Sequence, residues 1–541
     1  MPNNDKHIFV MILEKLIAKN YRTLRDVAID FQEHLNIIVG DNECGKSTIL
    51  EAINLGLSGQ LNGRSIQNEL HPFLFNRQTV TDFIESLKSA SPKEPPKIII
   101  ELYLKDDPEL VRLRGSINSL KRNCPGIVFS IEFDESFSQE YSEYIKTPET
   151  IRNIPIEYYG VYWRSFANDN ITSRSIPVSS TLIDASTIRH NTGANKYILE
   201  IMKDYLQPEQ RVQLSLSYRK MKDLFLSDDN VKKVNKILSD TKGSITDRTL
   251  SISLDSSSKS NWENGIETQL DEIPLSLAGK GEQNSIKIKL AMESADGANI
   301  FLIEEPENHL SFSNLNTLIK NISDKSTGKQ LIITTHSSFV LNKLGIKNVI
   351  LFGCDQKSIT LGNLKSDTYD YFMKLPGHET LRLILSKKAI LVEGPSDELI
   401  VQKAYLKKHN CMPLQNGVDV ITVNSLAFKR FLEISAPLNI PTVVVTDNDG
   451  DLTSLSQKYD DFKNNTHIKI CYDDDVACKT LEPQLLKANS LKTLNEIFGK
   501  NFATSNELLT YMTSNKTDCA LAVFNTSQDI NMPQYINKAV E

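Results

Sequence analysis

Acidic residues follow two apolar stretches in the second half of the chain, residues 389–392 and 442–445. The carboxylates come in order, with Glu393 and Asp397 after the first stretch and Asp447 and Asp449 after the second. If both stretches are parallel strands, their carboxyl ends open on the same edge of a sheet. Four carboxylates at one edge repel one another unless cations lie between them, and carboxylate oxygens suit Mg²⁺ or Mn²⁺. Each motif alone would also serve as turn or helix-cap chemistry, but together they predict a two-cation site that cleaves phosphodiester bonds.

A second set of residues predicts a nucleotide site. Residues 40–47 read Gly-Asp-Asn-Glu-Cys-Gly-Lys-Ser, which fits G-x-x-x-x-G-K-[ST], and they follow an apolar stretch and open a helical one. Backbone N–H groups of such a loop wrap phosphates, and the helix N-terminus adds partial positive charge. Lys46 would reach the β- and γ-phosphates of ATP, and Ser47 would ligate Mg²⁺. The predicted nucleotide-binding residues of the loop are Gly40, Asn42, Gly45, Lys46, Ser47 and Thr48. The alternative is a glycine-rich turn with a solvated lysine.

Residues 300–304, an apolar stretch that ends in two carboxylates with Glu305, predict the hydrolytic part of the ATP site. We expect Glu304 to lie near the Mg²⁺ water shell and Glu305 to orient or deprotonate the attacking water. His336, after the next apolar stretch, would touch the γ-phosphate as the switch histidine of an ABC ATPase. Residues 279–283 occupy the place of the ABC signature, with Gly279 and Gly281 as nucleotide-binding candidates, and Ser276 remains an alternative to Gly279.

Composition sets limits on partners and compartment. The formal net charge is −7, which counts mildly against a nucleic-acid binder, although bound cations would neutralise an acidic metal site. The seven cysteines are odd in number and form no C-x-x-C pair, so we expect neither a disulfide framework nor a zinc site. This cysteine usage favours a reducing cytosol. No apolar run approaches the roughly 18 residues of a membrane helix, and the first residues are polar. The chain is therefore expected to be cytoplasmic, without a membrane partner.

Strand-like stretches alternate with helical ones, which favours an α/β fold with parallel sheets in two domains. We expect an ABC-type P-loop ATPase domain over residues 1–383 and a second domain over residues 384–541. Helical periodicity from about residue 193 to residue 245 indicates an insertion and a candidate dimer contact. The expected strands are 13–18, 35–39, 97–104, 126–133, 154–164, 300–303, 331–334, 389–392, 418–423 and 442–445.

The E-G-x-x-D of residues 393–397, followed by the D-x-D of residues 447–449, resembles the TOPRIM domain of topoisomerases, primases and certain nucleases. An ABC ATPase followed by a TOPRIM domain resembles the OLD (overcoming lysogenization defect) family, which is related to the Gabija nuclease subunit and to retron-associated OLD-type effectors. The resemblance implies a Rossmann-like TOPRIM fold and an ATP-regulated, Mg²⁺-dependent DNA endonuclease in phage defence, active as a homodimer or larger oligomer. Thr480-Leu481-Glu482 is similar to the T-L-E motif of the family, so Glu482 would join the metal ligands. Lys516 matches the catalytic lysine, which would stabilise the charged phosphate.

Other functions remain open at this point. An ATP-driven DNA clamp or repair scaffold, similar to SMC and RecF proteins, would carry an inert TOPRIM domain, but the intact acidic set argues against it. A topoisomerase-like strand transferase would need a nucleophilic tyrosine in a companion domain. A helicase-like protein, or a retron reverse transcriptase with its RNA–DNA hybrid, is a possible defence partner. The DNA recognised, cleavage of RNA, the trigger and the sign of the ATP effect stay undetermined.

Overall fold

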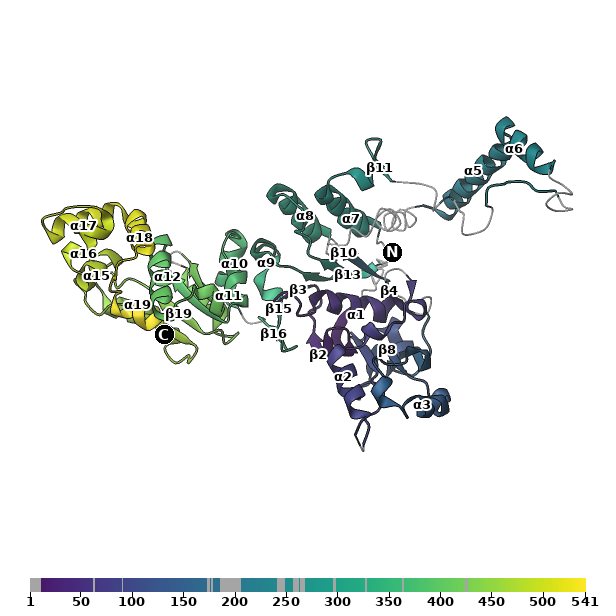
Figure 1. Cartoon of the computed structure of the whole chain (residues 1–541), viewed down its shortest axis with the longest axis horizontal. Coiled ribbons are helices and arrows are strands. Elements are labelled where there is room, and N and C mark those ends of the chain that lie inside the picture. Colours follow the sequence, from purple (N-terminus) through teal and green to yellow (C-terminus); the bar gives the residue numbers. More distant parts are fainter. Residues whose placement is uncertain are drawn as a thin grey trace, which may run out of the picture. The chain divides into compact units, whose positions relative to one another are not determined.

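A computed structural model describes the protein (Figure 1). The described residues are 11–61, 64–89, 91–172, 176, 179–184, 206–240, 249–255, 262, 268–294, 298–325, 328–361, 364–423 and 427–541. The chain forms two compact units, Met1–Arg22 with Ser47–Thr334, and Thr23–Lys46 with Thr335–Glu541. The expected boundary between residues 383 and 384 lies within the second unit and stays a prediction.

An antiparallel sheet forms one part of the first unit. Its strands β1 (Leu13–Tyr21), β6 (Ile98–Leu104), β8 (Cys124–Phe133) and β9 (Tyr159–Ser165) pair in that order, and the short β7 (Arg114–Gly115) also pairs with β8. Helix α1 (Lys46–Ser58) lies close to β6, because a Cβ on Gly56 would stand 2.7 Å from Leu102. The indole N–H of Trp163 donates to the Gly56 carbonyl over 2.9 Å. The sheet therefore supports the helix that follows the phosphate-binding loop.

Three parallel strands form another part of the first unit: β10 (Ser179–Asp184), β13 (Ala298–Glu304) and β14 (Gln330–Thr334). Side chains 300–303 are fully buried, as expected of a parallel strand covered on both faces. Register sets Glu304 opposite Asp184 on one side and Thr334 on the other. The carboxyl end of β13, with its two acids, thus lies at the common edge of the three strands.

The described helices of the first unit are, besides α1, α2 (Arg77–Ser86), α3 (Ser138–Tyr144), α5 (Pro208–Ser227), α6 (Asp229–Ser239), α7 (Lys280–Ser294) and α8 (Phe312–Lys325). Two-residue strand pairs are β4 (Gln60–Leu61) with β5 (Arg64–Ser65), and β11 (Gln269–Leu270) with β12 (Ile273–Pro274). Helices α5 and α6 fall within the expected insertion at residues 193–245. Residues 193–205 and 241–245 of that insertion lie outside the described residues.

The second unit begins with strands β2 (Leu24–Asp30) and β3 (Leu35–Val39) and returns to them near residue 349. Strand β3 pairs in parallel with β15 (Val349–Phe352), which pairs antiparallel with β16 (Ser358–Thr360). Helices α9 (Ser338–Leu344), α10 (Ser366–Lys374) and α11 (Thr380–Leu385) follow. The phosphate-binding loop therefore leaves β3 beside β15.

A four-stranded parallel sheet, drawn in green in Figure 1, forms the rest of the second unit. Its order is β18 (Val418–Thr422), β17 (Lys388–Val392), β19 (Thr442–Val445) and β20 (Ile468–Cys471). Helices α11 and α13 (Phe428–Ser435) pack together, and α12 (Pro395–His409) packs with α18 (Lys516–Asn525) and α19 (Gln534–Ala539). The remaining helices are α14 (Leu452–Lys458), α15 (Leu481–Ala488), α16 (Leu491–Phe498) and α17 (Ser505–Ser514). The neighbours β17 and β19 each end at one of the acidic motifs.

The structure differs from the expected elements in a few places. Strands β10, β15, β16 and β20 were not expected, nor were the two-residue strands β4, β5, β7, β11 and β12. Strand β2 continues the strand pair expected over residues 13–40. The expected strand at 154–164 begins only at Tyr159, because Pro155 leads into a 3-10 turn over Ile156–Tyr158. Within the described part of the chain, no helix is both long and apolar enough to cross a membrane.

Candidate functional site

Hydrogen bonds join the two acidic motifs at the carboxyl edge of the C-terminal sheet. Glu393 directly follows β17, and its Oε1 accepts from the Thr446 hydroxyl over 2.7 Å and from the Asp447 N–H over 3.2 Å. Thr446 and Asp447 directly follow β19, the neighbour of β17. The parallel pairing therefore brings Glu393 and Asp447 together, as the strand pattern predicts.

Asp397 lies in the first turn of α12, beside Glu393. Its Oδ2 accepts from the Gly394 N–H over 3.2 Å, which fixes the turn that starts the helix. The pKa of Asp397 is raised to about 6, first by burial and then by the negative charges of Glu393 and Glu482, while the hydrogen bond from the Gly394 N–H acts in the opposite direction. Asp397 therefore faces the same acidic site.

Asp447 shows the strongest mutual effect of these acids. Its pKa is raised to about 8, first by burial and then by the negative charges of Glu393, Asp397, Glu482 and Asp449. The other four carboxylates proposed as metal ligands in this domain thus all act on Asp447. Like charges that raise one another's pKa are typical of a site that a bound cation completes.

The carboxylate oxygens nevertheless do not lie close enough together to coordinate a single ion as they stand. Among the described residues, no three of them place ligand oxygens all within 4.8 Å of one another. Coulomb repulsion between them opposes closer approach, and Asp449, with φ of +48°, is exposed at the outer end of the motif. The oxygen-only donor set and the raised pKa values fit Mg²⁺ or Mn²⁺, which would draw these groups together.

Glu482 and Lys516, proposed from weaker sequence matches, contact each other. Glu482 lies in the first turn of α15, and its Oε2 accepts from the Thr480 hydroxyl over 2.8 Å. The Lys516 Nζ, at the start of α18, lies 3.2 Å from Glu482 Oε1. The Glu482 side chain is 5% exposed and that of Lys516 is 48% exposed. A half-exposed cation therefore stands beside the acidic site.

Asn448, between the two aspartates of the D-x-D, positions a neighbouring loop and was not singled out in the sequence. Its buried Nδ2 donates to the carbonyls of Asp473 and Asp475 over 2.8 and 2.9 Å, and its Oδ1 accepts from the Gly450 N–H over 2.9 Å. Asn448 thus ties the loop after β20 to the acidic motif. In the sequence, Asn448 stands between the two carboxylates of the predicted D-x-D motif.

Tyr535, at the start of α19, is buried close to the acids. Complete burial raises its pKa well above the usual value, and Asp447, Asp397, Asp473 and Glu393 raise it in turn. The C-terminal segment therefore contributes a buried tyrosine close to the acidic site.

The phosphate-binding loop belongs to the second unit up to Lys46. The buried Lys46 ammonium donates to the carbonyls of Gly40 and Asp41, over 2.8 Å in each case. Gly45 has φ of +103°, and a Cβ there would stand 2.6 Å from the Thr23 hydroxyl, so this position requires glycine. Asn42 is exposed and Thr48 is half-buried at the start of α1. The lysine thus bonds the backbone of its own loop.

The residues expected to hydrolyse ATP in the first unit lie at the start of α1 and at the end of β13. The Ser47 hydroxyl donates to Glu304 Oε1, which brings together the two groups expected near Mg²⁺. Glu305 adopts φ of +42°, a left-handed conformation that is uncommon outside glycine and is found at functional sites. Asn308 Nδ2 donates to Glu305 Oε2 over 2.8 Å and holds that carboxylate.

The signature segment precedes and opens α7. A Cβ on Gly281 would stand 2.1 Å from the His309 carbonyl oxygen, whereas one on Gly279 would meet nothing within 4 Å. The buried Gln283 amide donates to the carbonyls of Ser276 and Ala278. Gly281 therefore serves packing. Gly279 retains room for a ligand, which favours it without excluding Ser276.

In the second unit, His336 is exposed after β14.

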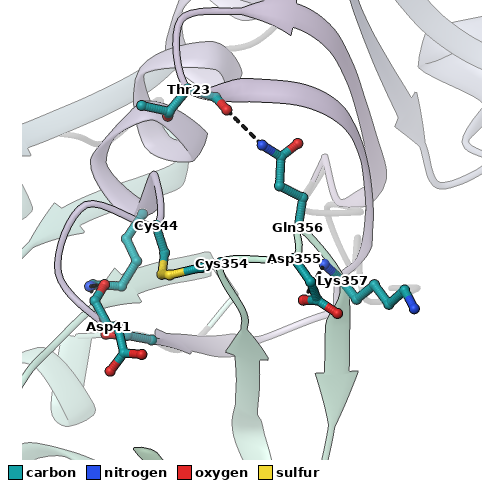
Figure 2. Close-up of a disulfide and its surroundings, with 9 residues drawn as sticks. Thr23, Asp41, Cys44, Cys354, Asp355, Gln356 and Lys357 are labelled. Carbon is teal, nitrogen blue, oxygen red and sulfur yellow. Dashed lines mark hydrogen bonds between the residues drawn. A yellow bond between two sulfur atoms is a disulfide. The ribbon is translucent and has the colours of Figure 1, made fainter. Parts of the chain in front are cut away.

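The cysteines contradict the expectation of a chain without disulfides. Cys44, in the phosphate-binding loop, is bonded to Cys354, in the turn between β15 and β16 (Figure 2). The strand pairing of β3 with β15 brings the two residues together over a sequence separation of 310, which an odd cysteine count could not reveal. The other five cysteines are free thiols.

Comparisons with known proteins agree with this arrangement. A family described as AAA domain matches residues 15–273, and the family described as overcoming lysogenization defect protein-like, TOPRIM domain, matches residues 384–449. The OLD nuclease of Thermus scotoductus is 23% identical over 474 residues, which cover 81% of this chain and 82% of that protein.

Endonuclease GajA of Bacillus cereus (strain VD045) is 26% identical over 152 residues, 28% of this chain, and the match spans only 26% of GajA itself. A solved structure of the recombination mediator protein RecF with ATP matches at 13% identity with a TM-score of 0.34, covering 66% of this chain and 100% of that one. The two family matches and the mixed α/β structure confirm the fold expected from the sequence, with a P-loop ATPase part and a C-terminal TOPRIM domain. As its resemblance to the OLD family implies, the chain joins an AAA domain to a TOPRIM domain of the overcoming-lysogenization-defect type.

Proposed function

We propose that this chain is a cytoplasmic, ATP-regulated DNA endonuclease that uses Mg²⁺ or Mn²⁺ and acts in defence against phages. The observation that supports the proposal is the junction of the two acidic motifs, where Glu393 accepts from the Thr446 hydroxyl and the Asp447 N–H, and where four other carboxylates raise the pKa of Asp447. Stability alone would favour apolar residues at a buried position of this kind, whereas bound cations would make the acids favourable.

Residues of the acidic site divide between metal binding and phosphate binding. The carboxylates that would hold the cations are Glu393, Asp397, Asp447, Asp449 and Glu482. Bound cations would supply an activated water and would neutralise the charge that develops on the scissile phosphate. Lys516, held beside Glu482 and half-exposed, would bind a phosphate oxygen of the DNA.

The ATP residues would perform a separate hydrolysis. Lys46 would bind the β- and γ-phosphates, and Ser47 with Glu304 would hold the Mg²⁺ of the nucleotide. Glu305, held by Asn308, would orient the attacking water, and His336 would contact the γ-phosphate. ABC-type sites are completed by the signature segment of a second subunit, so the proposal includes a homodimer or a larger oligomer.

Helices α5 and α6 support the dimer with apolar side chains that are more than half exposed. These are Val212, Leu216, Met221, Leu224 and Ile237. Exposed apolar residues gathered on two adjoining helices are typical of an interface between subunits. The names of the relatives, OLD nuclease and Endonuclease GajA, support the cleavage activity. Recruitment of a helicase-like protein or a retron reverse transcriptase stays a prediction.

A plasmid-cleavage assay with matched variants tests the proposal. The full chain is incubated with supercoiled plasmid and Mg²⁺ or Mn²⁺, with EDTA as the metal-free control. Asp447→Ala and Asp449→Ala should each slow cleavage by about 10²–10³-fold, because each removes a ligand of the cations. Asp460→Ala serves as the control, since Asp460 is an exposed acid of the same domain paired only with Lys463.

The outcome separates the nuclease from its main alternative. If Asp447→Ala and Asp449→Ala cut plasmid at the wild-type rate, the acidic site is not catalytic. The ATP-driven DNA clamp or repair scaffold would then be the better account of the chain. Cleavage that persists undiminished in EDTA would contradict the metal dependence.

A further inference from the structure

The disulfide Cys44–Cys354 ties the phosphate-binding loop to a neighbouring turn. Cys44 is 5% exposed and stands between Glu43, with φ of +66°, and Gly45, with φ of +103°. Cys354 is exposed, and the two Cα atoms are 4.7 Å apart. Figure 2 shows the bond at the side of the loop, with Asp41 next to it. The loop that would take up phosphate is therefore covalently fixed at its centre.

The turn that carries Cys354 is itself firmly held. Gln356 Nε2 donates to the Thr23 carbonyl over 2.8 Å (Figure 2). Gln356 Oε1 accepts from the Arg25 N–H, also over 2.8 Å. Within the turn, the Gln356 N–H donates to the Gly353 carbonyl over 2.9 Å. These bonds fasten the turn to the start of β2. The turn is therefore an anchor for the loop rather than a freely moving partner.

The same loop is closed around its own lysine. The Lys46 ammonium donates to the carbonyls of Gly40 and Asp41, at the positions that precede the loop's centre. Gly40 is packed against β15, since a Cβ there would stand 2.2 Å from the Phe352 carbonyl oxygen. To bind a nucleotide, Lys46 must exchange these carbonyls for phosphate oxygens, and we expect the segment 41–44 to move outward as it does so. A bond from Cys44 to the anchored turn opposes that movement.

We propose that Cys44 and Cys354 form a redox modification site and that their oxidation lowers the affinity of the chain for ATP. The inference rests on the proposed ATP site and adds its regulation. When the two cysteines are thiols, the loop opens and its N–H groups and Lys46 bind the phosphates. When they are joined, the loop is held in its closed form, and the free energy of binding must also cover its distortion.

The oxidation is a thiol–disulfide exchange with a low-molecular-weight disulfide. The exposed Cys354 thiolate attacks one sulfur of the small disulfide, and the first small thiolate leaves as the mixed disulfide forms. Cys44 then attacks Cys354 in that mixed disulfide, and the second small thiolate leaves. The two cysteine protons end on the two small thiols, and two electrons pass from the protein to the small disulfide. Reducing thiols reverse both steps through the exposed Cys354.

Calorimetric titration of the full chain with ATP and Mg²⁺ tests the inference. One sample is oxidised with glutathione disulfide and another is reduced with a phosphine, and mass spectrometry after alkylation verifies the state of the cysteines. The oxidised wild type should bind ATP about tenfold more weakly than the reduced form. Cys354→Ser should bind like the reduced wild type under both conditions. Cys411→Ser, which alters a free and partly exposed cysteine, should keep the full redox response.

Three outcomes overturn the inference. They are equal ATP affinity of the verified oxidised and reduced forms, a redox response that persists in Cys354→Ser, and failure of Cys44 and Cys354 to pair under oxidation. Lys46→Ala distinguishes a failure of the ATP site itself. If reduced wild type and reduced Lys46→Ala bind ATP alike, the loop is not the nucleotide site, and the proposed function falls together with its regulation.

Discussion

The Nζ of Lys516 lies 3.2 Å from Oε1 of Glu482, a pair that joins the start of α18 to the start of α15. Glu482 is buried and acts on the pKa of both Asp397 and Asp447, so the lysine stands at the rim of the acidic site. The cation partly offsets the excess negative charge and still presents donors to solvent. Its place is suited to a phosphate that approaches bound cations from outside.

Removal of the Lys516 charge should therefore affect DNA cleavage and leave ATP hydrolysis unchanged. We expect Lys516→Met to slow plasmid cleavage by about 10²-fold, because the transition-state phosphate loses a charged donor. Lys492→Met is the matched control, since Lys492 is exposed and lies 4.0 Å from Glu496 on one helix. Single-turnover cleavage at saturating Mg²⁺ gives the rates, and an equal rate for the two variants would remove Lys516 from the site.

The raised pKa of Asp447 predicts a stability that depends on pH and on metal. The native carboxyl, with a pKa of about 8, keeps its proton in a range where the unfolded chain, with a pKa near 3.8, loses it. The native state thus binds more protons, and stability falls as pH rises from about 4 to about 8, then levels off. Asp397, with a pKa of about 6, has the same sign over the lower part of this range.

Asp447→Asn should remove much of this loss. We compare the free energy of unfolding at about pH 5 and about pH 9 without divalent metal. Between these values, wild type should lose on the order of 2 kcal/mol more than the variant, after allowance for solvent screening. Mg²⁺ should stabilise wild type most at the higher pH and stabilise the variant little. Thermal unfolding with EDTA or Mg²⁺ measures both effects. If Mg²⁺ leaves the melting temperature of wild type unchanged at high pH, the result would contradict the metal site.

Much of the site could be predicted because its residues sit at strand ends. Glu393 and Asp447 each follow a short apolar stretch, and parallel pairing of β17 with β19 then requires them to meet. Glu304 was found in the same way, from the stretch before it. These predictions need only local sequence and the rule that parallel strands share a carboxyl edge.

Contacts between distant segments could not be predicted in this way. The disulfide of Cys44 with Cys354 depends on the pairing of β3 with β15, and no local sequence pattern predicts that pairing. Strand β10 was missed because Ser179–Asp184 begins with polar residues and has few apolar ones. Asn448 was missed because an amide between two carboxylates reads as part of a solvated loop.

Asn448 should act on cleavage through position. Asn448→Ala removes the donor to the Asp473 and Asp475 carbonyls, so the loop after β20 should detach from the acidic motif at a cost of about 1–3 kcal/mol. We expect the Mg²⁺ concentration for half-maximal cleavage to rise, with ATP hydrolysis unchanged. Asn506→Ala, at an exposed helix position, is the control. A merely destabilised fold would lower activity at every Mg²⁺ concentration without shifting that midpoint.

Glu305→Gln should separate ATP binding from ATP hydrolysis. The amide cannot accept a proton from water, so phosphate release should slow by about 10²–10³-fold while nucleotide affinity stays near that of wild type. Asn308, which donates to the carboxylate, can also donate to the amide oxygen, so local structure should persist. Glu149→Gln changes an exposed glutamate and provides the control. An unchanged rate of hydrolysis would assign the catalytic base elsewhere, with Glu304 as the next candidate.

The two chemistries should be separable in variants and coupled in cells. Lys46 and Glu393 lie in segments matched by two different families, and each belongs to its own set of ligands. Glu393→Gln retains an oxygen to accept from Thr446 and Asp447 but lacks the charge that a cation requires. It should therefore abolish plasmid cleavage and leave ATP hydrolysis within about twofold of wild type.

Lys46→Ala should weaken ATP binding and change the nucleotide dependence of cleavage without altering Mg²⁺ binding at the acidic site. If cleavage under nucleotide control is the biological activity, both variants should lose protection in a phage-plating assay. Full protection by Glu393→Gln would instead assign the activity to the ATPase alone and leave the TOPRIM domain as a scaffold.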